Sequence, residues 1–479
     1  MAREQEIIKE RLKKIQELKE NGIEVYKYSF DKKDSAEDLQ KKYEKLKAGQ
    51  ATKNKAKIAG RVMIVRELGK INFIKLQDSS GKIQIILQQD KTPKKIIEFF
   101  KKYIDAGDFI GVDGKIMRTE RGELSILVEH LELLSKALLP LPEKWHGLQD
   151  KEERYRKRYL DLIMNPEVKK VFETREKIID EIKNFLKEKK FTEVETPNLQ
   201  PLYGGAEARP FITNLYALNM KLYLSISPEI YLKKLIIGGF ERVFTICKNF
   251  RNEGIDKWHN PEFTMLELYQ SYTDYNEMMK LTEQLLFTLV KKIHGKTKID
   301  YQGKNLDFAI PFKKMTMLEA IKKIAKINAE KMEAEKINEI FEEKVQPNLI
   351  QPTFIIDYPK ELCPLTKEHR KNKKFVERFE LFVNGIELAN AYSELNDSIE
   401  QEKRLKQQIE DRKKAKDFDA HFEANVIDED FVKAMSYGMP PLGGIGIGID
   451  RLAMFLTNSS SVRDVILFPF MRAEEKGGN

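Results

Sequence analysis

The segment FRNEGIDKWHNPEFTMLELY, residues 250–269, places a short polar loop between two strand-like runs. Its charged and aromatic side chains are denser than a structural hairpin needs: Arg251, Glu253, His259, Glu262, Phe263 and Glu267. The arginine can grip a phosphate, and Phe263 can stack on a purine ring. The segment therefore predicts an antiparallel strand pair that carries a nucleotide-binding loop. Taken alone, His259 is more typical of an exposed surface.

A second segment, GGIGIGIDRL at residues 443–452, alternates glycine with isoleucine. In a strand, Gly444, Gly446 and Gly448 share one face and leave it bare, while the isoleucines pack into the core. A flat ligand can lie on the bare face, and Arg451, at the start of the next helix, can meet a phosphate. Close packing of two elements beside a surface arginine explains the pattern equally well. Neither a P-loop nor the glycine spacing of a dinucleotide fold occurs.

A third segment, RFELFVNGIELANAYSELND at residues 378–397, predicts a hairpin with Asn384-Gly385 at its turn. Glu380 and Glu387 then share one face, where they can hold magnesium together with nucleotide phosphates; on an exposed face they would only be solvated. Three further polar residues alternate on the opposite parity: Asn390, Tyr392 and Glu394. A bulge near Ala389 is needed to aim both sets at one pocket.

The rest of the chain suggests two domains. Strand patterns in the order strand-strand-strand-helix-strand-strand over residues 57–136 predict a five-stranded oligonucleotide-binding (OB) barrel. A helix follows a proline-containing linker; Asn165 can cap it and Pro166 suits its first turn. Helices, strands and hairpins then alternate without a βαβ repeat, which indicates an α+β domain with an antiparallel sheet. The expected divisions are a basic helical extension at 1–56, the barrel at 57–136, a linker at 137–157, the second domain at 158–473 and a tail at 474–479.

Composition limits the class of protein. The 479 residues are 34% charged and 41% hydrophobic, and no apolar run approaches the ~20 residues that cross a bilayer. Only two cysteines occur, and the N-terminus does not look like a secretion signal, so we expect a cytoplasmic protein without disulfides. Residues 1–57 hold 16 Lys or Arg against 11 Asp or Glu, which fits polyanion binding or simply lysine-rich usage. The lysine-rich stretch 313–345 is expected to be helical surface.

Taken together, VETPNLQP at 194–201, FRNEG…HNPEF and GIGIGIDR resemble the three motifs of class II aminoacyl-tRNA synthetases. Further segments resemble bacterial lysyl-tRNA synthetases: RYLDL from Arg158, GGAEARPFIT from Gly204, SPEIYLKKL from Ser227 and SELND from Ser393. The resemblance runs from about residue 57 to 472. It implies a barrel that binds the anticodon, a catalytic domain, homodimerisation through the first motif, and the partners ATP, L-lysine and tRNA(Lys).

The resemblance also implies residue roles. Arg251 and Arg451 would be catalytic, Arg251 at the ATP α-phosphate and the lysine carboxylate and Arg451 on the γ-phosphate side. The remaining ATP-binding residues would be Glu253, His259, Phe263 and Gly448, with Glu380 and Glu387 also holding two or three magnesium ions. The lysine pocket, besides Arg251, would contain Gly205, Glu229, Glu267, Tyr269, Asn390, Tyr392, Glu394 and Gly446. In the barrel, Arg66, Phe73, Gln84 and Glu123 would bind the anticodon.

Charge arguments favour lysine as the substrate. A pocket that buries an ammonium must supply carboxylates, which Glu229 and Glu394 can do, whereas an aspartate pocket needs a cation instead. The implied reaction forms lysyl-adenylate and pyrophosphate from lysine and ATP, then transfers the lysyl group to tRNA and releases AMP. The alternatives are an aspartate- or asparagine-specific relative, a lysyl transferase acting on protein or lipid, and a catalytically silent tRNA-binding regulator. The segment between Ile321 and Pro352 is shorter and richer in lysine than expected of bacterial relatives.

Overall fold

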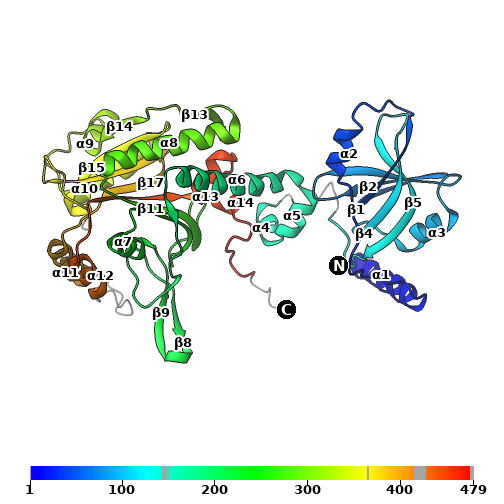
Figure 1. The fold of residues 1–479 in the computed structure, drawn as a ribbon, viewed down its shortest axis with the longest axis horizontal. Coiled ribbons are helices and arrows are strands. Elements are labelled where there is room, and N and C mark those ends of the chain that lie inside the picture. Colours follow the sequence, from blue (N-terminus) through cyan, green and yellow to red (C-terminus); the bar gives the residue numbers. More distant parts are fainter. Residues whose placement is uncertain (1, 143–147, 149, 364–365, 415–427, 475–479) are drawn as a thin grey trace. The chain divides into compact units, whose positions relative to one another are not determined.

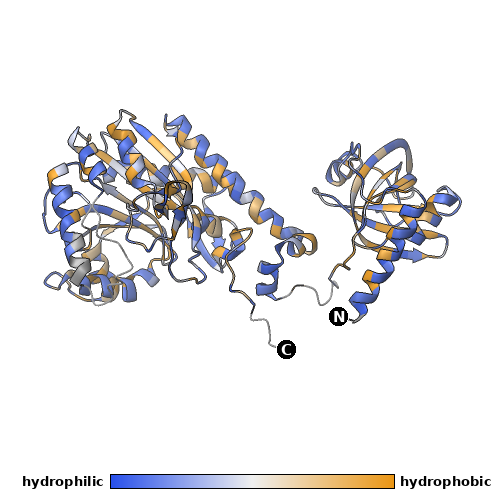
Figure 2. Cartoon of the chain, turned by 90° about the horizontal axis from the view of Figure 1, so that it is seen from below, coloured by the Kyte–Doolittle hydropathy of each residue, from blue (hydrophilic) through white to orange (hydrophobic). Residues whose placement is uncertain are grey.

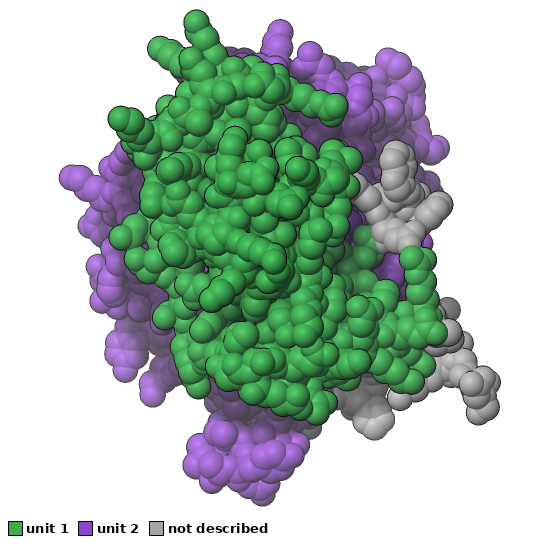
Figure 3. All heavy atoms as spheres, turned by 90° about the vertical axis from the view of Figure 1, so that its right-hand side faces the viewer, with its two compact units in different colours: residues 1–147 green, residues 148–479 purple. Residues whose placement is uncertain are grey.

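The computed structural model describes residues 2–142, 148, 150–363, 366–414 and 428–474. The chain forms two compact units, residues 1–147 and 148–479 (Figure 3). Part of the predicted linker, residues 143–147 and 149, lies outside the described residues, as does the predicted tail beyond residue 474. Among the helices of the described ranges, none has the length and apolar character that a membrane span requires.

The first unit is built on a closed barrel with the strand order β1-β2-β3-β5-β4, which confirms the predicted OB fold. The helix α3 follows β3, as the sequence pattern predicts. The strands are β1 (Ala51–Leu68), β2 (Ile71–Gln77), β3 (Lys82–Gln88), β4 (Phe109–Arg118) and β5 (Leu124–Ser135), and the helices are α1 (Ala2–Glu20), α2 (Ala36–Lys42) and α3 (Lys94–Tyr103).

The basic extension at the N-terminus packs into the core of the barrel unit. Ile15 and Leu18 of α1, Val25 in the following loop and Leu39 of α2 are buried in one cluster with barrel residues such as Ile58. The apolar stripe of α1 thus faces the barrel, which leaves most of its lysines exposed. Hydrophobic burial therefore holds the extension in place, whatever its charges bind.

The second unit contains an eight-stranded sheet with the order β14-β15-β16-β17-β18-β11-β10-β6 (Figure 1). Its pairings are antiparallel except at the two edges, where β14 pairs with β15 and β6 with β10 in parallel. The predicted α+β fold with an antiparallel core is confirmed. The sheet strands are β6 (Thr192–Glu193), β10 (Arg242–Phe250), β11 (Glu262–Ser271), β14 (Lys313–Thr316), β15 (Thr353–Pro359), β16 (Phe375–Val383), β17 (Ile386–Ser393) and β18 (Leu442–Gly448).

Helices cover this sheet, and two smaller sheets flank it. The long helices alternate hydrophilic and hydrophobic residues along their length (Figure 2), and α6 and α8 bury Ile178, Ile182 and Leu285 in the main core. The helices are α4 (Lys151–Arg156), α5 (Arg158–Met164), α6 (Pro166–Glu188), α7 (Glu229–Ile237), α8 (Tyr275–His294), α9 (Met317–Ala320), α10 (Ala334–Ile340), α11 (Ser398–Lys414), α12 (Glu429–Ser436), α13 (Ile449–Leu456) and α14 (Val462–Val465). The smaller sheets hold β7 (Leu199–Gln200), β8 (Ile212–Leu215) and β9 (Met220–Leu224), and β12 (Lys298–Tyr301) and β13 (Lys304–Asp307).

Two local predictions need correction. Asn165 precedes α6 and Pro166 opens it, but the Asn165 side chain does not cap the helix, because its Nδ2 donates to Asp161 Oδ1 at 2.8 Å. The stretch 313–345 is not simply helical surface. It begins with β14 at the sheet edge, and Met317 and Phe341 are buried in a separate core with residues of β15 and β16. Apolar residues between the lysines drive this packing.

Candidate functional site

The bare glycine face of β18 forms the floor of a cavity of about 780 Å³. Neighbouring strands align their side chains across this floor. Gly446 of β18 pairs with Glu267 of β11 on one side and with Asn390 of β17 on the other. Two residues earlier on β18, Gly444 pairs in the same way with Tyr269 and Tyr392. The strand register thus gathers predicted residues from three separate segments at one surface.

Gly444 has no room for a side chain. A Cβ at this position would lie 2.3 Å from Glu394 Oε1 and 2.4 Å from the Tyr269 ring. By contrast, a Cβ at Gly448 would meet only the side chain of Arg451, at 3.6 Å or more. Glycine at 444 is therefore required because two other cavity residues occupy the space above it.

The predicted bulge is present in β17. Both turn residues, Asn384 and Gly385, have positive φ, and Val383 pairs with Ile386 as the two-residue hairpin predicts. Phe382 then pairs with Glu387, whereas the preceding Leu381 pairs with Ala389, so one extra residue, Leu388, lies in the second strand. This extra residue changes the parity of the strand. As a result Glu380, Glu387, Asn390, Tyr392 and Glu394 all line the cavity.

One end of the cavity is acidic. Glu394 and Glu267 are 3% and 5% exposed, and Glu229 at the start of α7 contributes a third carboxylate. Lys233, which sequence reasoning did not select, contacts Glu229 Oε1 at 2.6 Å and Glu394 Oε2 at 2.7 Å. Gly205, with φ +83°, lies against the first turn of α7, so that a Cβ there would be 2.8 Å from Glu229 Cβ.

Burial shifts the proton affinity of these groups. Desolvation, together with Glu229, raises the pKa of Glu267 to about 8, although Ser227 Oγ donates to its carboxylate at 3.1 Å. Desolvation also raises the pKa of Glu394 to about 7, against the opposing effect of Lys233. Burial opposes the charged form of Lys233, but its two carboxylates hold the lysine pKa above its ordinary value. This end of the cavity is therefore poised to exchange protons for a cation.

Another part of the cavity wall is positively charged, because Arg251 lines it. Arg251 follows β10 and its guanidinium lies 5.1 Å from the centre of the Phe263 ring. Its Nε is buried without a hydrogen-bond partner among the described residues, and so is Glu394 Oε1. Buried polar atoms without partners are rare because each one costs free energy. A ligand that brings an anion to Arg251 and a cation to Glu394 would satisfy both.

The residues predicted to bind ATP lie beside this cavity. Arg451 Nη1 donates to the Glu387 carbonyl oxygen at 2.7 Å, and Arg451 Nη2 lies 3.1 Å from His259 Nε2. His259 Nδ1 lies 2.9 Å from Asp256 Oδ2. Glu253 is exposed in the loop between β10 and β11. The structure thus brings Glu387, His259 and Arg451 together, while Gly448 forms the N-cap of the helix that carries Arg451.

Glu380 and Glu387 fit a magnesium ion that also binds phosphates. Both line the cavity, burial raises the pKa of Glu380, and Glu387 raises it further through charge repulsion. Tyr358 Oη donates to Glu380 Oε2 at 2.8 Å, and Arg378 contacts Glu380 Oε1. Nowhere in the described residues do three or more acidic, histidine or cysteine side chains form a metal-binding group. Both oxygens of Glu380 already have a partner, so a magnesium ion here would share Glu380 with Tyr358 and Arg378 and take its other ligands from Glu387, phosphates and water.

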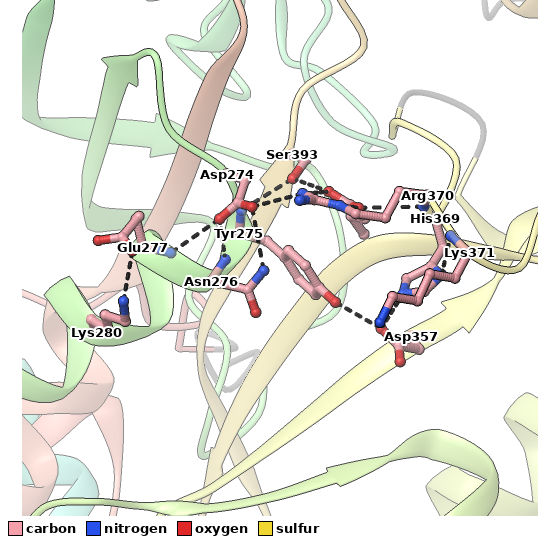
Figure 4. A network of polar contacts seen from close by, with 11 residues as sticks. Asp274, Tyr275, Asn276, Glu277, Lys280, Asp357, His369, Arg370, Lys371 and Ser393 are labelled. Atoms are coloured by element: carbon pink, nitrogen blue, oxygen red, sulfur yellow. Dashed lines mark hydrogen bonds and ion pairs between the residues drawn. The ribbon is translucent and has the colours of Figure 1, made fainter.

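A polar network holds the end of β17 next to Glu394 (Figure 4). Ser393 Oγ donates to Glu377 Oε2 at 2.6 Å and accepts from the Tyr275 backbone N–H at 3.0 Å. Arg370 donates to Glu377 and, at 2.6 Å, to Asp274 Oδ2. Although burial opposes ionisation, Arg370 and Ser393 lower the pKa of Glu377. Each buried charge in the network is therefore paired, which fixes the strand that carries the cavity residues.

The residues predicted to read an anticodon form one patch on the barrel. Arg66 of β1 pairs with Phe73 of β2, and Gln84 of β3 pairs with Lys75, two residues beyond Phe73. Lys75 also contacts Glu123 just before β5. Gln84 is only 7% exposed, and its buried Nε2 donates to Ser125 Oγ at 2.9 Å. The four predicted side chains are thus neighbours, with a lysine between them.

Among the cavity residues that sequence reasoning missed, two carry a buried positive charge. Lys233 lies one helical turn after Glu229, and this i, i+4 spacing of opposite charges was a usable signal. Arg378 lies two residues before Glu380 on the same strand face, and its Nε donates to Asn390 Oδ1 at 3.2 Å. Its guanidinium also lies 4.6 Å from the centre of the Tyr358 ring. No sequence pattern marks Arg378, since its partners come from three strands.

Comparisons with known proteins agree with both units. Residues 150–472 match the family model of class II tRNA synthetases (D, K and N), and residues 56–134 match that of the OB-fold nucleic acid binding domain. The chain is 46% identical to a lysine–tRNA ligase of Methanoculleus marisnigri, over 98% of this chain and 96% of the relative. It is 48% identical to those of Carboxydothermus hydrogenoformans and Syntrophomonas wolfei, over 98% of this chain and 99% and 97% of the relatives.

Proposed function

The chain belongs to the lysine–tRNA ligases, class II synthetases that use ATP to charge tRNA(Lys) with lysine, and we propose that the cavity on β18 is where lysine is activated. The observation that carries this proposal is the pair of buried atoms without partners, Arg251 Nε and Glu394 Oε1. Lysine has a carboxylate for Arg251 and a side-chain ammonium for Glu394. The pKa of Glu267 is raised by Glu229 and lowered by Arg251, so its carboxylate interacts with both residues. We propose that Glu267 binds the α-ammonium of lysine.

The remaining residues of this pocket orient the substrate. Tyr269 and Tyr392 pair with Gly444 from the two neighbouring strands, and Asn390 pairs with Gly446. Gly205 packs against the first turn of α7. Together they leave a channel that suits an extended aliphatic chain between a cationic end and an acidic end.

ATP is proposed to lie over Phe263, with its phosphates between Arg251 and Arg451. Phe263 offers a ring face for the adenine, and Glu253 is free to accept the adenine amino group. His259 and Gly448 support the outer phosphates beside Arg451. Glu380 and Glu387 would hold magnesium, which supplies charge neutralisation for the triphosphate. Both carboxylates line the cavity wall, which supports this assignment.

In the first step, a carboxylate oxygen of lysine attacks the α-phosphorus of ATP, the bond to the bridging oxygen breaks, and pyrophosphate leaves. In the second step, a terminal ribose hydroxyl of tRNA attacks the lysyl carbonyl and AMP leaves. No protein nucleophile is needed. Arg251 binds the lysine carboxylate and the α-phosphate together, which brings the reacting atoms into line. Arg251 and Arg451 offset the charge that builds on the phosphates.

We also propose a homodimer in the cytoplasm. The hairpin of β8 and β9 extends from the second unit (Figure 1). Large apolar side chains in and beside its small sheet are exposed: Leu199, Ile212, Tyr216 and Leu218. Such a patch is costly in water and suits a second copy of the chain. The two free cysteines, Cys247 and Cys363, suit a reducing compartment. Sedimentation of the full chain tests the dimer, and a monomer at micromolar concentration would contradict it.

The proposed function is tested by lysine-dependent exchange between ATP and pyrophosphate. We expect exchange with lysine and none with aspartate or asparagine, followed by charging when tRNA is added. Arg251→Ala should abolish exchange, because it removes the only group proposed to bind both reacting partners. Arg156→Ala, which removes an arginine that pairs with Glu152 within α4, is a control for loss of an arginine outside the proposed site. Near-normal exchange by the Arg251→Ala variant would refute the assignment.

A further inference from the structure

Lys233 is a buried cation that has no role in the reaction proposed above. Its side chain lies on the inner face of α7 and is 2% exposed. Its Nζ contacts one oxygen of Glu229 and one of Glu394, and it lies 5.8 Å from the centre of the Tyr269 ring. A buried ammonium persists only where carboxylates compensate for its lost hydration.

The charges at this end of the cavity do not balance. Glu229, Glu267 and Glu394 face one another across α7, β11 and the end of β17, and their cation within the acidic end is Lys233. Lys233 engages Glu394 through Oε2 only. The second oxygen, Oε1, is buried without a partner at the bare face of β18, where a Cβ on Gly444 would lie 2.3 Å from it. A second cation can therefore bind beside Lys233.

We propose that Lys233 is a positioning residue for substrate selection, which holds the side chains of Glu229 and Glu394 in place so that Glu394 Oε1 is free to accept the side-chain ammonium of the substrate. This inference rests on the proposed lysine pocket. Lys233 acts through the two carboxylates rather than by touching the substrate. Its own charge is satisfied by them, so it offers no anchor to an acidic substrate such as aspartate.

The protonation of Glu394 provides a measurable consequence. Its pKa is about 7, because burial raises it while Lys233 lowers it. The groups that surround it are Lys233 and Glu229 of α7, Glu267 and Tyr269 of β11, and Tyr392 of β17. On the neighbouring helices, Arg404 pairs with Glu400 and Asp428 with Lys234. Without Lys233, Glu394 would bind a proton at neutral pH and could no longer attract an ammonium.

The test compares Lys233→Met with the conservative variant Lys233→Arg. The matched control is Lys234→Met, because Lys234 is the adjacent lysine and pairs with Asp430 rather than with Glu394. For Lys233→Met we expect the KM for lysine in pyrophosphate exchange to rise at least about tenfold at pH 7, as loss of a charged hydrogen bond predicts. The KM for ATP should hardly change. The ratio of the variant KM to the wild-type KM should shrink toward pH 9, where Glu394 ionises again. Lys233→Arg should lose less, and Lys234→Met should resemble the wild type.

Two results would overturn the inference. A lower KM for lysine in Lys233→Met would mean that Lys233 competes with the substrate, and a KM ratio that is constant with pH would mean that it only supports the fold. If Lys233→Met does not fold, the charge-balanced double variant Lys233→Met/Glu394→Gln replaces it. Relative to Glu394→Gln alone, it should lose little further affinity for lysine. A full additional loss would also overturn the inference. Wild-type protein without lysine-dependent exchange would refute the proposed function instead.

Discussion

At the scale of single residues, the cavity combines groups that neutralise one another only when a substrate is present. Glu267 and Glu394 carry raised pKa values of about 8 and about 7 because burial disfavours their ionised forms. Elsewhere in the cavity, Arg251 Nε is buried and has no hydrogen-bond partner among the described residues. Lysine supplies two cations and one anion, so its binding converts three unfavourable burials into paired interactions.

The first prediction is that lysine binding expels protons. Below about pH 7 the free enzyme holds protons on Glu267 and Glu394, and a bound ammonium favours the carboxylate forms. The KM for lysine should therefore fall as the pH rises from about 6 to 8.5, by at most about tenfold per pH unit for each carboxyl that releases its proton. Calorimetry in buffers with different protonation enthalpies should report the release. A pH-independent KM without proton exchange would contradict the assignment.

At the scale of elements, the register of β17 and β18 determines the shape of the cavity. The glycine strand makes room for Glu394 and Tyr269, and the bulge at Leu388 turns the polar residues of β17 toward that room. The network of Arg370, Glu377 and Ser393 then fixes the end of the strand. The register of these strands therefore determines which charged side chains lie in contact.

The second prediction concerns the glycine strand. Gly444→Ala would place a methyl group 2.3 Å from Glu394 Oε1 and 2.4 Å from the Tyr269 ring, so these two proposed lysine-binding residues must shift. We expect the variant to lose nearly all lysine-dependent exchange and its Tm to fall by several degrees, because overpacking a buried site costs about 1–3 kcal/mol. Gly448→Ala meets only Arg451, at 3.6 Å or more, and should lose far less. Equal activities of the two variants would argue against Glu394 and Tyr269 as residues of the lysine pocket.

The third prediction concerns the short helices before α6. Arg158 is 2% exposed; it contacts Asp161 at 2.8 Å and donates to the carbonyl oxygens of Arg463 and Leu467. Arg158→Ala leaves the buried Asp161 short of a partner and should cost about 3–5 kcal/mol of unfolding free energy. Arg156→Ala, which removes an exposed i, i+4 pair with Glu152, should cost about 1 kcal/mol or less. Urea denaturation followed in the second unit measures both, and similar losses would contradict the prediction.

Much of this architecture could be predicted from local patterns. Alternating apolar residues and turn signals located the barrel, and the parity of residues 380–394 required the bulge that β17 contains. Predictions failed where a side chain found a distant partner. Asn165 bonds Asp161 rather than capping α6, and Lys233 turns inward toward Glu394, which is 161 positions away in sequence. Local spacing cannot reveal such choices, because tertiary contacts decide them.

At the scale of the whole molecule, the two units have separate cores. Ile58 and Leu76 belong to the barrel cluster, whereas Leu266 and Ile447 belong to the main cluster of the second unit. The barrel carries Arg66, Phe73, Gln84 and Glu123, and the second unit carries every residue proposed to touch ATP or lysine. Changes on the barrel should therefore affect tRNA and leave the formation of the adenylate untouched.

The fourth prediction follows from this division. Phe73 is partly exposed beside Arg66 and Lys75, so it can stack on an anticodon base. Because a stacked base contributes about 1–3 kcal/mol, Phe73→Ala should raise the KM for tRNA(Lys) about tenfold or more in the charging assay. Pyrophosphate exchange without tRNA should match the wild type. Tyr28→Ala, which removes an exposed aromatic ring elsewhere in the same unit, serves as the control. An unchanged KM for tRNA would refute the role of Phe73.

The separate cores also bear on how such a protein can change over generations. A mutation that loosens one of these hydrophobic clusters removes no side chain from the other, since each cluster takes its residues from one unit. The residues that recognise the anticodon and the residues that form the aminoacyl bond can therefore accumulate substitutions at different rates. Recombination can likewise replace one unit without disrupting the hydrophobic core of the other.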